Sequence, residues 1–153
     1  MPLAIAACGY WLDDEVKVER ARVALENQQY SAAIIDAKSV LLNAPDNAVA
    51  RVVLGRALAA NGEFEAAESH LQQALVQGQP IDDFRVALAQ ARLMTGQPEQ
   101  ALMIADPSAA ANEKEALLLW LYRGDALADL GKSADALRGD SGALRSVDSS
   151  TPI

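Results

Sequence analysis

Catalytic chemistry would need nucleophiles, bases or metal ligands, and the sequence holds few of them. His70 is the only histidine and Cys8 the only cysteine, so neither a His/Cys metal cluster nor an internal disulfide is available. His70 stands among polar neighbours, which predicts an exposed surface position. Nucleophilic catalysis would also need a base and a third, orienting group, and the sequence indicates no such set. We therefore expect no enzyme activity, no cofactor and no metal site.

Two groups of adjacent carboxylates could also take part in catalysis. They are Asp13-Asp14-Glu15 and Asp82-Asp83. General acid–base catalysis by a carboxyl pair needs a pocket that raises one of the two pKa values. Both groups precede predicted helices, where carboxylates cap free backbone N–H groups and offset the helix dipole. Helix capping therefore explains both groups better than catalysis does.

The charge balance restricts the partners. The 153 residues carry 13 Lys and Arg against 21 Asp and Glu, a net charge of −8. Because nucleic-acid affinity comes largely from clustered cations, we expect no nucleic-acid partner. The chain is 51% hydrophobic, with 31 Ala and 20 Leu, which favours an all-α domain with a substantial core. No apolar run approaches the roughly 20 residues that span a bilayer, so no transmembrane span is expected.

A nearly fixed interval recurs along the chain. Gly62 and Gly96 are 34 residues apart, as are Ala67 and Ala101, and a fourth copy follows after 35. The interval divides the chain into four units. These are residues 14–47, 48–81, 82–116 and 117–147.

Each unit is expected to contain two helices joined by a turn. In the second unit the apolar pattern predicts helices from Ala48 to Asn61 and from Phe64 to Val76, with Gly62 between them. Small residues recur where the two helices of a unit would cross, because a larger side chain would push them apart. They are Ala21, Gly55, Ala89 and Gly124 in the first helices and Ala33, Ala67, Ala101 and Ala136 in the second.

This pattern resembles the tetratricopeptide repeat (TPR). The matching residues are Trp120-Leu121-Tyr122-Arg123-Gly124 and Leu127 for a first helix, and Phe64, Ala67, Leu71 and Ala74 for a second, with Pro45 ending the first unit. The resemblance covers residues 14–137 and implies a right-handed α-solenoid of about four helix-turn-helix units. It departs at Pro98, which replaces an aromatic residue, and at Asp106-Pro107, which should end the second helix of the third unit near Ala105.

The resemblance also implies a function. TPR proteins commonly hold a peptide, helix or loop of a partner protein in a concave groove, so a non-catalytic protein–protein interaction scaffold is expected. Carried over by position, the groove residues are Glu15, Val18, Arg22, Val52, Arg56, Val86, Gln90, Leu93, Leu121 and Asp125. Arg22 and Arg56 either hold a carboxylate or are solvated arginines that pair along their helix, as Arg22 would with Glu26.

Both ends of the chain differ from the repeats. Ile5-Ala6-Ala7-Cys8 resembles a bacterial lipobox, in which Cys8 would carry a lipid anchor, although the basic and long apolar parts of a signal peptide are missing. Residues 1–13 are thus either a signal remnant whose true start lies upstream or a disordered terminus. The solenoid should end at residue 145, followed by a flexible tail over 146–153. The uncovered last unit also predicts a weak homo-oligomer.

Two classes of function remain open. The first is a scaffold of the bacterial cell envelope, in the periplasm if an upstream signal exists. Three runs are similar to the TPR lipoprotein of exosortase (PEP-CTERM) sorting systems, which accompany exopolysaccharide genes; they are Ala32 to Lys38, Leu54-Gly55-Arg56 and Ala66-Ala67-Glu68. The second class is a soluble cytoplasmic adaptor or co-chaperone that captures a peptide C-terminus. Only Arg22 and Arg56 supply cations for that capture, which favours the envelope scaffold.

Overall fold

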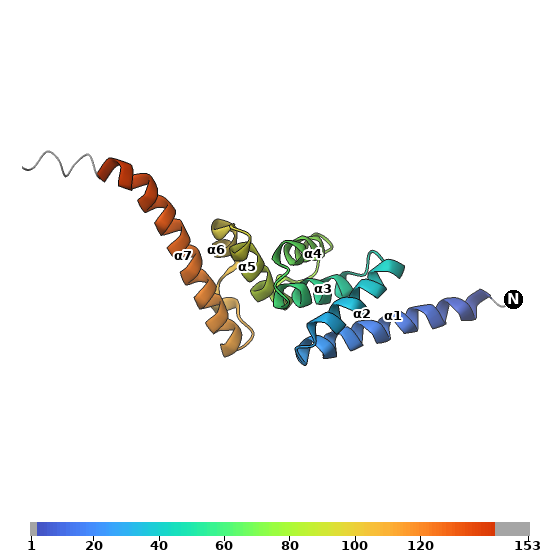
Figure 1. Cartoon of the computed structure of the whole chain (residues 1–153). Helices are drawn as coiled ribbons and strands as arrows, with labels where there is room; N and C mark the ends of the chain where they lie inside the picture. The colour runs from blue at the N-terminus through green and yellow to red at the C-terminus, as the bar shows by residue number, and fades with distance from the viewer. Residues whose placement is uncertain (1–2, 143–153) are drawn as a thin grey trace, which may run out of the picture.

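The computed structural model describes the backbone of residues 3–142 and the side chains of residues 14–132. Every regular element in this part of the chain is helical, as predicted (Figure 1). The elements are α1 (Leu3–Glu26), α2 (Tyr30–Asn43), α3 (Ala48–Ala60), α4 (Phe64–Val76), η1 (Ile81–Asp83), α5 (Arg85–Met94), α6 (Pro98–Ile104), η2 (Pro107–Ala109) and α7 (Glu113–Gly142), where η marks a short 3-10 helix. The predicted helices of the second unit and the early end of α6 are confirmed.

The helices form an α-solenoid of stacked pairs. α1 packs on α2, α3 on α4 and α5 on α6, and each first helix also contacts the next first helix along the chain, from α1 to α3, α5 and α7. Figure 1 shows these helices following one another in chain order across the molecule. A fold in which each unit contacts its neighbours in series is the α-solenoid that the repeat interval predicts.

The turn inside each pair has the same geometry. The backbone is left-handed at Gln28 (φ 60°), Gly62 (φ 86°) and Gly96 (φ 75°), which occupy one position of the repeat. The next residue then donates its N–H to the carbonyl five residues back, from Gln29 to Ala24, Glu63 to Leu58 and Gln97 to Arg92. This bond satisfies a carbonyl that the helix end would leave free, so each pair turns back in the same way.

Small residues lie where the helices of a pair cross. The first helices place Ala21, Gly55 and Ala89 at the crossing, the second helices place Ala33, Ala67 and Ala101 there, and all six are buried. A Cβ atom on Gly55 would lie 2.5 Å from Cδ2 of Leu71. The predicted close approach is therefore confirmed for the first three pairs.

A second set of positions joins each pair to the one before it. Ala50, Phe84 and Leu119 share one repeat position, Ala57, Ala91 and Ala126 share another, and all six are buried. In α1 the same two positions hold Val16 and Val23, which are exposed. The difference arises because α1 has no preceding pair to pack against, as expected at the end of a solenoid.

The fourth unit departs from the predicted helix pair. α7 is one helix from Glu113 to Gly142, so Gly131 does not begin a turn. Gly124, predicted to lie at a helix crossing, is exposed, and no atom lies within 4 Å of the place where its Cβ would be. The prediction of a second helix in this unit is wrong, because the residues around Gly131, such as Leu130 and Lys132, favour continuation of the helix.

The first residues also differ from the expected separate terminus. α1 begins at Leu3, so the backbone of residues 3–13 continues the first helix. Asp13-Asp14-Glu15 therefore lie inside α1 and do not cap it, and buried Asp14 instead accepts a hydrogen bond from Asn43 Nδ2 at 3.2 Å. The side chain of Cys8 and the predicted tail over 146–153 lie outside the described residues. Among the described helices, none has the length and apolar character of a membrane span.

Candidate functional site

Two adjoining hollows lie along the first helices and form what we call the groove. The larger, of about 520 Å³, lies between α1, α3, α5 and α7, and the smaller, of about 350 Å³, extends along α1 and α3. Both are lined by Arg56, Asp82, Asp83 and Glu115, which makes them one continuous surface. A concave surface built from successive first helices is the binding surface expected of a helical solenoid.

Five of the ten predicted groove residues line the groove. They are Arg22, Val52, Arg56, Val86 and Gln90. The other five, which line neither hollow, are Glu15, Val18, Leu93, Leu121 and Asp125. Val18 is buried against Val40 and Ala50 instead, because α2 and α3 cover that side of α1. Leu121 and Asp125 are exposed on α7.

Several lining residues were not predicted. Tyr30 begins α2, and Lys114, Glu115 and Tyr122 belong to α7. The repeat pattern assigns groove positions only to first helices in regular register. It therefore contains no signal for a residue at the start of a second helix, or for the rotation of α7 that brings Tyr122 to the groove.

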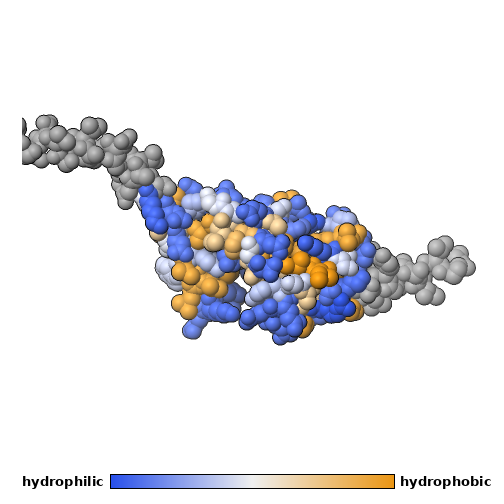
Figure 2. All heavy atoms as spheres, viewed as in Figure 1, coloured by the Kyte–Doolittle hydropathy of each residue, from blue (hydrophilic) through white to orange (hydrophobic). Residues whose placement is uncertain are grey.

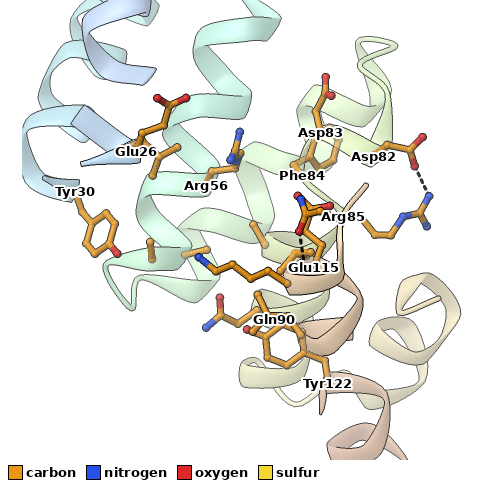
Figure 3. Close-up of a pocket in the computed structure, with 18 of the residues that line it drawn as sticks. Glu26, Tyr30, Arg56, Asp82, Asp83, Phe84, Arg85, Gln90, Glu115 and Tyr122 are labelled. Carbon is orange, nitrogen blue, oxygen red and sulfur yellow. Dashed lines mark hydrogen bonds and ion pairs between the residues drawn. The ribbon is translucent and has the colours of Figure 1, made fainter. Parts of the chain in front are cut away.

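Arg56 is the central cation of the groove. It projects from α3 and lines both hollows, and Figure 3 shows it between Glu26 and Asp83. Arg56 is exposed and makes no hydrogen bond or ion pair with any described residue. Its guanidinium therefore keeps all of its donors for a ligand, and its planar geometry suits a carboxylate.

The other arginines at the groove are already engaged. Arg22 forms an ion pair with Glu19 at 3.6 Å, so it does pair along its helix, although with Glu19 and not with Glu26. Arg85 pairs with Asp82 at 2.5 Å and donates a second hydrogen bond to the carbonyl of Ile104 at 3.3 Å. Arg85 thus fixes the groove wall to α6, and Arg56 is the arginine that a ligand can reach without breaking another contact.

Carboxylates flank Arg56 on the groove wall. Figure 3 shows Glu26, Asp83 and Glu115 around the larger hollow, each from a different element. Glu115 accepts a hydrogen bond from the backbone N–H of Ala111 at 3.1 Å. Arg56 therefore stands among negative groups, with Lys114 as a second cation of the larger hollow, and the surroundings of Arg56 complement a segment that carries an acidic residue between basic ones.

Apolar and hydroxyl groups complete the groove. Val52, Val86, Leu118 and Ala59 supply apolar surface along its length. Tyr122 is half-buried, and its burial, aided by the charge of Asp125, raises the pKa of its phenol. The hydroxyl is therefore protonated at neutral pH and able to donate a hydrogen bond. The groove thus combines apolar side chains with many polar and charged groups, as a site for a polar peptide segment requires.

His70 lies away from the groove, on α4. It is half-buried and not exposed as predicted, and its Nδ1 atom is buried without a hydrogen-bond partner. Burial lowers the pKa of its imidazole, and the positive charges of Arg51 and Lys38 lower it further. Among the described side chains, no three His, Cys, Asp or Glu residues gather into a possible metal site.

The family assignment agrees with this geometry. Two tetratricopeptide repeat family models match the sequence, one over residues 18–84 and the other over residues 83–107, so that together they cover more than half of the chain. No curated protein matches the sequence closely enough to count as a relative. The chain belongs to the tetratricopeptide repeat proteins. Membership of this family makes it, in general terms, a scaffold for protein–protein interaction.

Proposed function

We propose that this protein is a non-catalytic scaffold that holds a segment of a partner protein in the groove, with a partner carboxylate on Arg56. The observation that carries the proposal is an arginine without a partner among the described residues, at the centre of a concave surface that has both apolar and charged side chains. A two-pronged hydrogen bond between guanidinium and carboxylate would fix the register of the bound segment. The flanking carboxylates Glu26 and Asp83 would select basic residues on either side of it.

Selection from a phage-displayed library of random twelve-residue peptides tests this proposal. The selected peptides should be enriched in sequences with an acidic residue between basic ones. Arg56→Gln should weaken their binding about tenfold, since a charge-assisted hydrogen bond contributes about 1.5–3 kcal/mol. Lys38→Gln is the matched control, because it removes one exposed positive charge from α2, outside the groove. Equal binding by the Arg56→Gln variant and the wild type would refute the role of Arg56.

The smaller hollow supports an alternative, a soluble adaptor that captures a peptide C-terminus. Arg22 and Arg56 line this same hollow, so both guanidinium groups face one cavity. A terminal carboxylate would draw Arg22 away from Glu19, an exposed pair that contributes little to stability. Amidation of the C-terminus distinguishes the two ideas, because it abolishes binding by the alternative and leaves binding through an internal Asp or Glu unchanged.

We propose a location at the cell envelope for this scaffold. The support is the lipobox-like sequence Ile5-Ala6-Ala7-Cys8, which lies near the start of the chain. Mass spectrometry of Cys8 in protein from the native membrane fraction tests the location. A diacylglycerol-modified Cys8 at a new N-terminus is the expected result, and protein confined to the soluble fraction with an unmodified Cys8 would contradict it.

A place in an exosortase (PEP-CTERM) system is the most specific form of the envelope proposal. Its support is the similarity of the runs Ala32 to Lys38 and Leu54-Gly55-Arg56 to the TPR lipoprotein of those systems. Deletion of the gene should then lower the amount of exopolysaccharide at the cell surface. Unchanged polysaccharide in the deletion strain, with full complementation as the control, would argue against this system.

A further inference from the structure

One face of α7 is apolar and has no partner among the described residues. Its large members are Leu117 (69% exposed), Trp120 (62%), Leu121 (55%) and Leu127 (51%). Gly124, Ala128 and Gly131 complete the face, and all three are exposed. These seven residues follow one another at helical spacings of three and four, so they share one side of the helix. We call them the α7 face.

The opposite side of α7 packs on the solenoid. Leu119 and Ala126 are buried there, and Leu119 contacts Ala89 and Ala105 of the preceding pair. In Figure 2, orange side chains gather at the lower left of the molecule, where Figure 1 places the first turns of α7. The α7 face is therefore exposed because of the way α7 docks, and it contains no charged residue over four turns.

The chain after Gly131 is poorly suited to cover this face. In the second and third pairs one fully buried repeat position holds Leu71 of α4 and Ala105, the residue directly after α6. The corresponding residue of the fourth unit is Asp140, and a buried carboxylate without a partner is strongly unfavourable. α7 also continues without a break through Gly139 to Gly142. The chain up to Gly142 therefore supplies no covering helix for the α7 face.

We infer that the α7 face binds the α7 face of a second copy, in an antiparallel arrangement with its two-fold axis at Gly124. Three of the four large residues lie before Gly124, and Leu127 is the one large residue after it. An antiparallel pair places Leu117 opposite Gly131, Trp120 opposite Ala128, and Gly124 opposite Gly124, and it brings Leu121 against Leu127. Leu117 and Trp120 thus meet small residues, Leu121 and Leu127 meet in an apolar contact, and the two helices approach closely at the axis. A parallel pair would instead place large residues opposite large ones.

The exposed area is sufficient for a weak dimer. The four large side chains of the α7 face expose roughly 500 Å² per copy, since a large side chain offers 150–250 Å² in full. Two copies would bury about 1,000 Å², near the lower limit for a specific interface. An apolar patch of this size is comparable with the largest patch on a typical monomer, which is often a functional surface. The expected dimer therefore forms at micromolar rather than nanomolar concentrations.

Disulfide trapping tests the geometry directly. In the full chain carrying Cys8→Ser, Gly124→Cys should form a crosslinked dimer under mild oxidation, because the two copies of this position meet at the axis. Gly131→Cys is the matched control, since it is also an exposed glycine of α7 with no atom within 4 Å of its Cβ position. In the antiparallel pair its two copies lie about 21 Å apart, too far for a disulfide. Equal crosslinking of both variants, or of neither, would overturn the proposal.

Sedimentation equilibrium supplies an independent readout. The wild type should shift from monomer to dimer mass between about 1 and 300 μM, in keeping with the small interface. Gly124→Leu adds an apolar side chain where the monomer has open space, so it should fold at least as well. It nevertheless obstructs the close approach and should raise the dimer dissociation constant at least tenfold. A strictly monomeric wild type, or association unchanged or strengthened by Gly124→Leu, would contradict the proposed packing.

Discussion

Two glycines at equivalent repeat positions have opposite surroundings. Gly55 faces Leu71 across the α3–α4 crossing, and a Cβ atom there would lie 2.5 Å from the buried leucine side chain. Gly124 faces open space on α7. Packing therefore requires a glycine at position 55. Within the described chain, no contact requires one at position 124, although both glycines occupy the same position of the repeat.

These surroundings predict opposite effects for the same substitution. Gly55→Ala should lower the free energy of unfolding by about 1–3 kcal/mol, because the added methyl group overpacks the crossing. Gly124→Ala should raise it by about 0.5–1 kcal/mol, because alanine favours a helix interior. Urea denaturation at low protein concentration measures both. A Gly55→Ala variant as stable as the wild type would show that Leu71 moves aside easily.

The buried imidazole of His70 predicts a pH-dependent stability. Its pKa is lowered from 6.5 in the folded protein, chiefly by burial, so the unfolded chain binds the proton more readily. Its contribution to stability is complete above pH 6.5 and declines as the pH falls through the folded-state pKa. Urea denaturation between pH 5 and 7.5 should show this decline in the wild type and a weaker one in His70→Gln. Identical pH profiles would exclude His70 as the cause.

The sequence predicted residue types better than residue environments. The small residues at Ala33, Ala67 and Ala101 were identified because spacing alone places them at crossings. His70 was expected on the surface because its neighbours in the sequence are polar. Its burial depends on the neighbouring helix pair, including Arg51 of α3, which the local sequence does not show.

At the scale of elements, α7 differs from every other helix in the described chain. Among its residues with described side chains, which end at Lys132, Ala126 is the last that is buried, and the six that follow it are exposed or half-buried. A helix without tertiary contacts is only marginally stable in water. The helix pairs, in contrast, are held by contacts on both sides.

Hydrogen–deuterium exchange should reveal this gradient. At low micromolar concentration, amides of residues 127–132 in α7, none of which is buried, should exchange much faster than those of Val52 to Gly55 in α3, all of which are buried. Exchange in α7 should slow at higher protein concentration if the α7 face dimerises. Equal protection of both segments at low concentration would contradict the prediction that this part of α7 is less protected than α3.

The sequence defined the helix boundaries well where turns recur and less well where packing decides. Gly62 and Gly96 mark turns because a left-handed residue is needed there and the second helix can fold back. Gly131 has the same position but no turn, because the following segment, with Asp140 in place of Leu71, offers little apolar surface to bury. Repeat spacing predicts where a turn is possible, and burial decides whether it forms.

At the scale of the whole molecule, the stacked pairs create a groove that no single pair contains. α1, α3, α5 and α7 each contribute lining residues, and Arg56 lies where the two hollows meet. The sequence predicted this groove. Five of the ten residues that it assigned to the groove do line it. It missed Tyr30, Lys114 and Tyr122, because the rotation of successive pairs and the docking of α7 depend on packing between units.

The measurement that tests the central claim most directly is photo-crosslinking of a library-selected peptide to the full chain. A benzophenone amino acid replaces Ala60, which is exposed within the groove, or Ile35, which is exposed on α2 outside it. Mass spectrometry then identifies the crosslinked products. Crosslinks from position 60 and none from position 35 are the predicted result. Crosslinks from position 35 alone, or equally from both, would show that partners bind elsewhere on the solenoid.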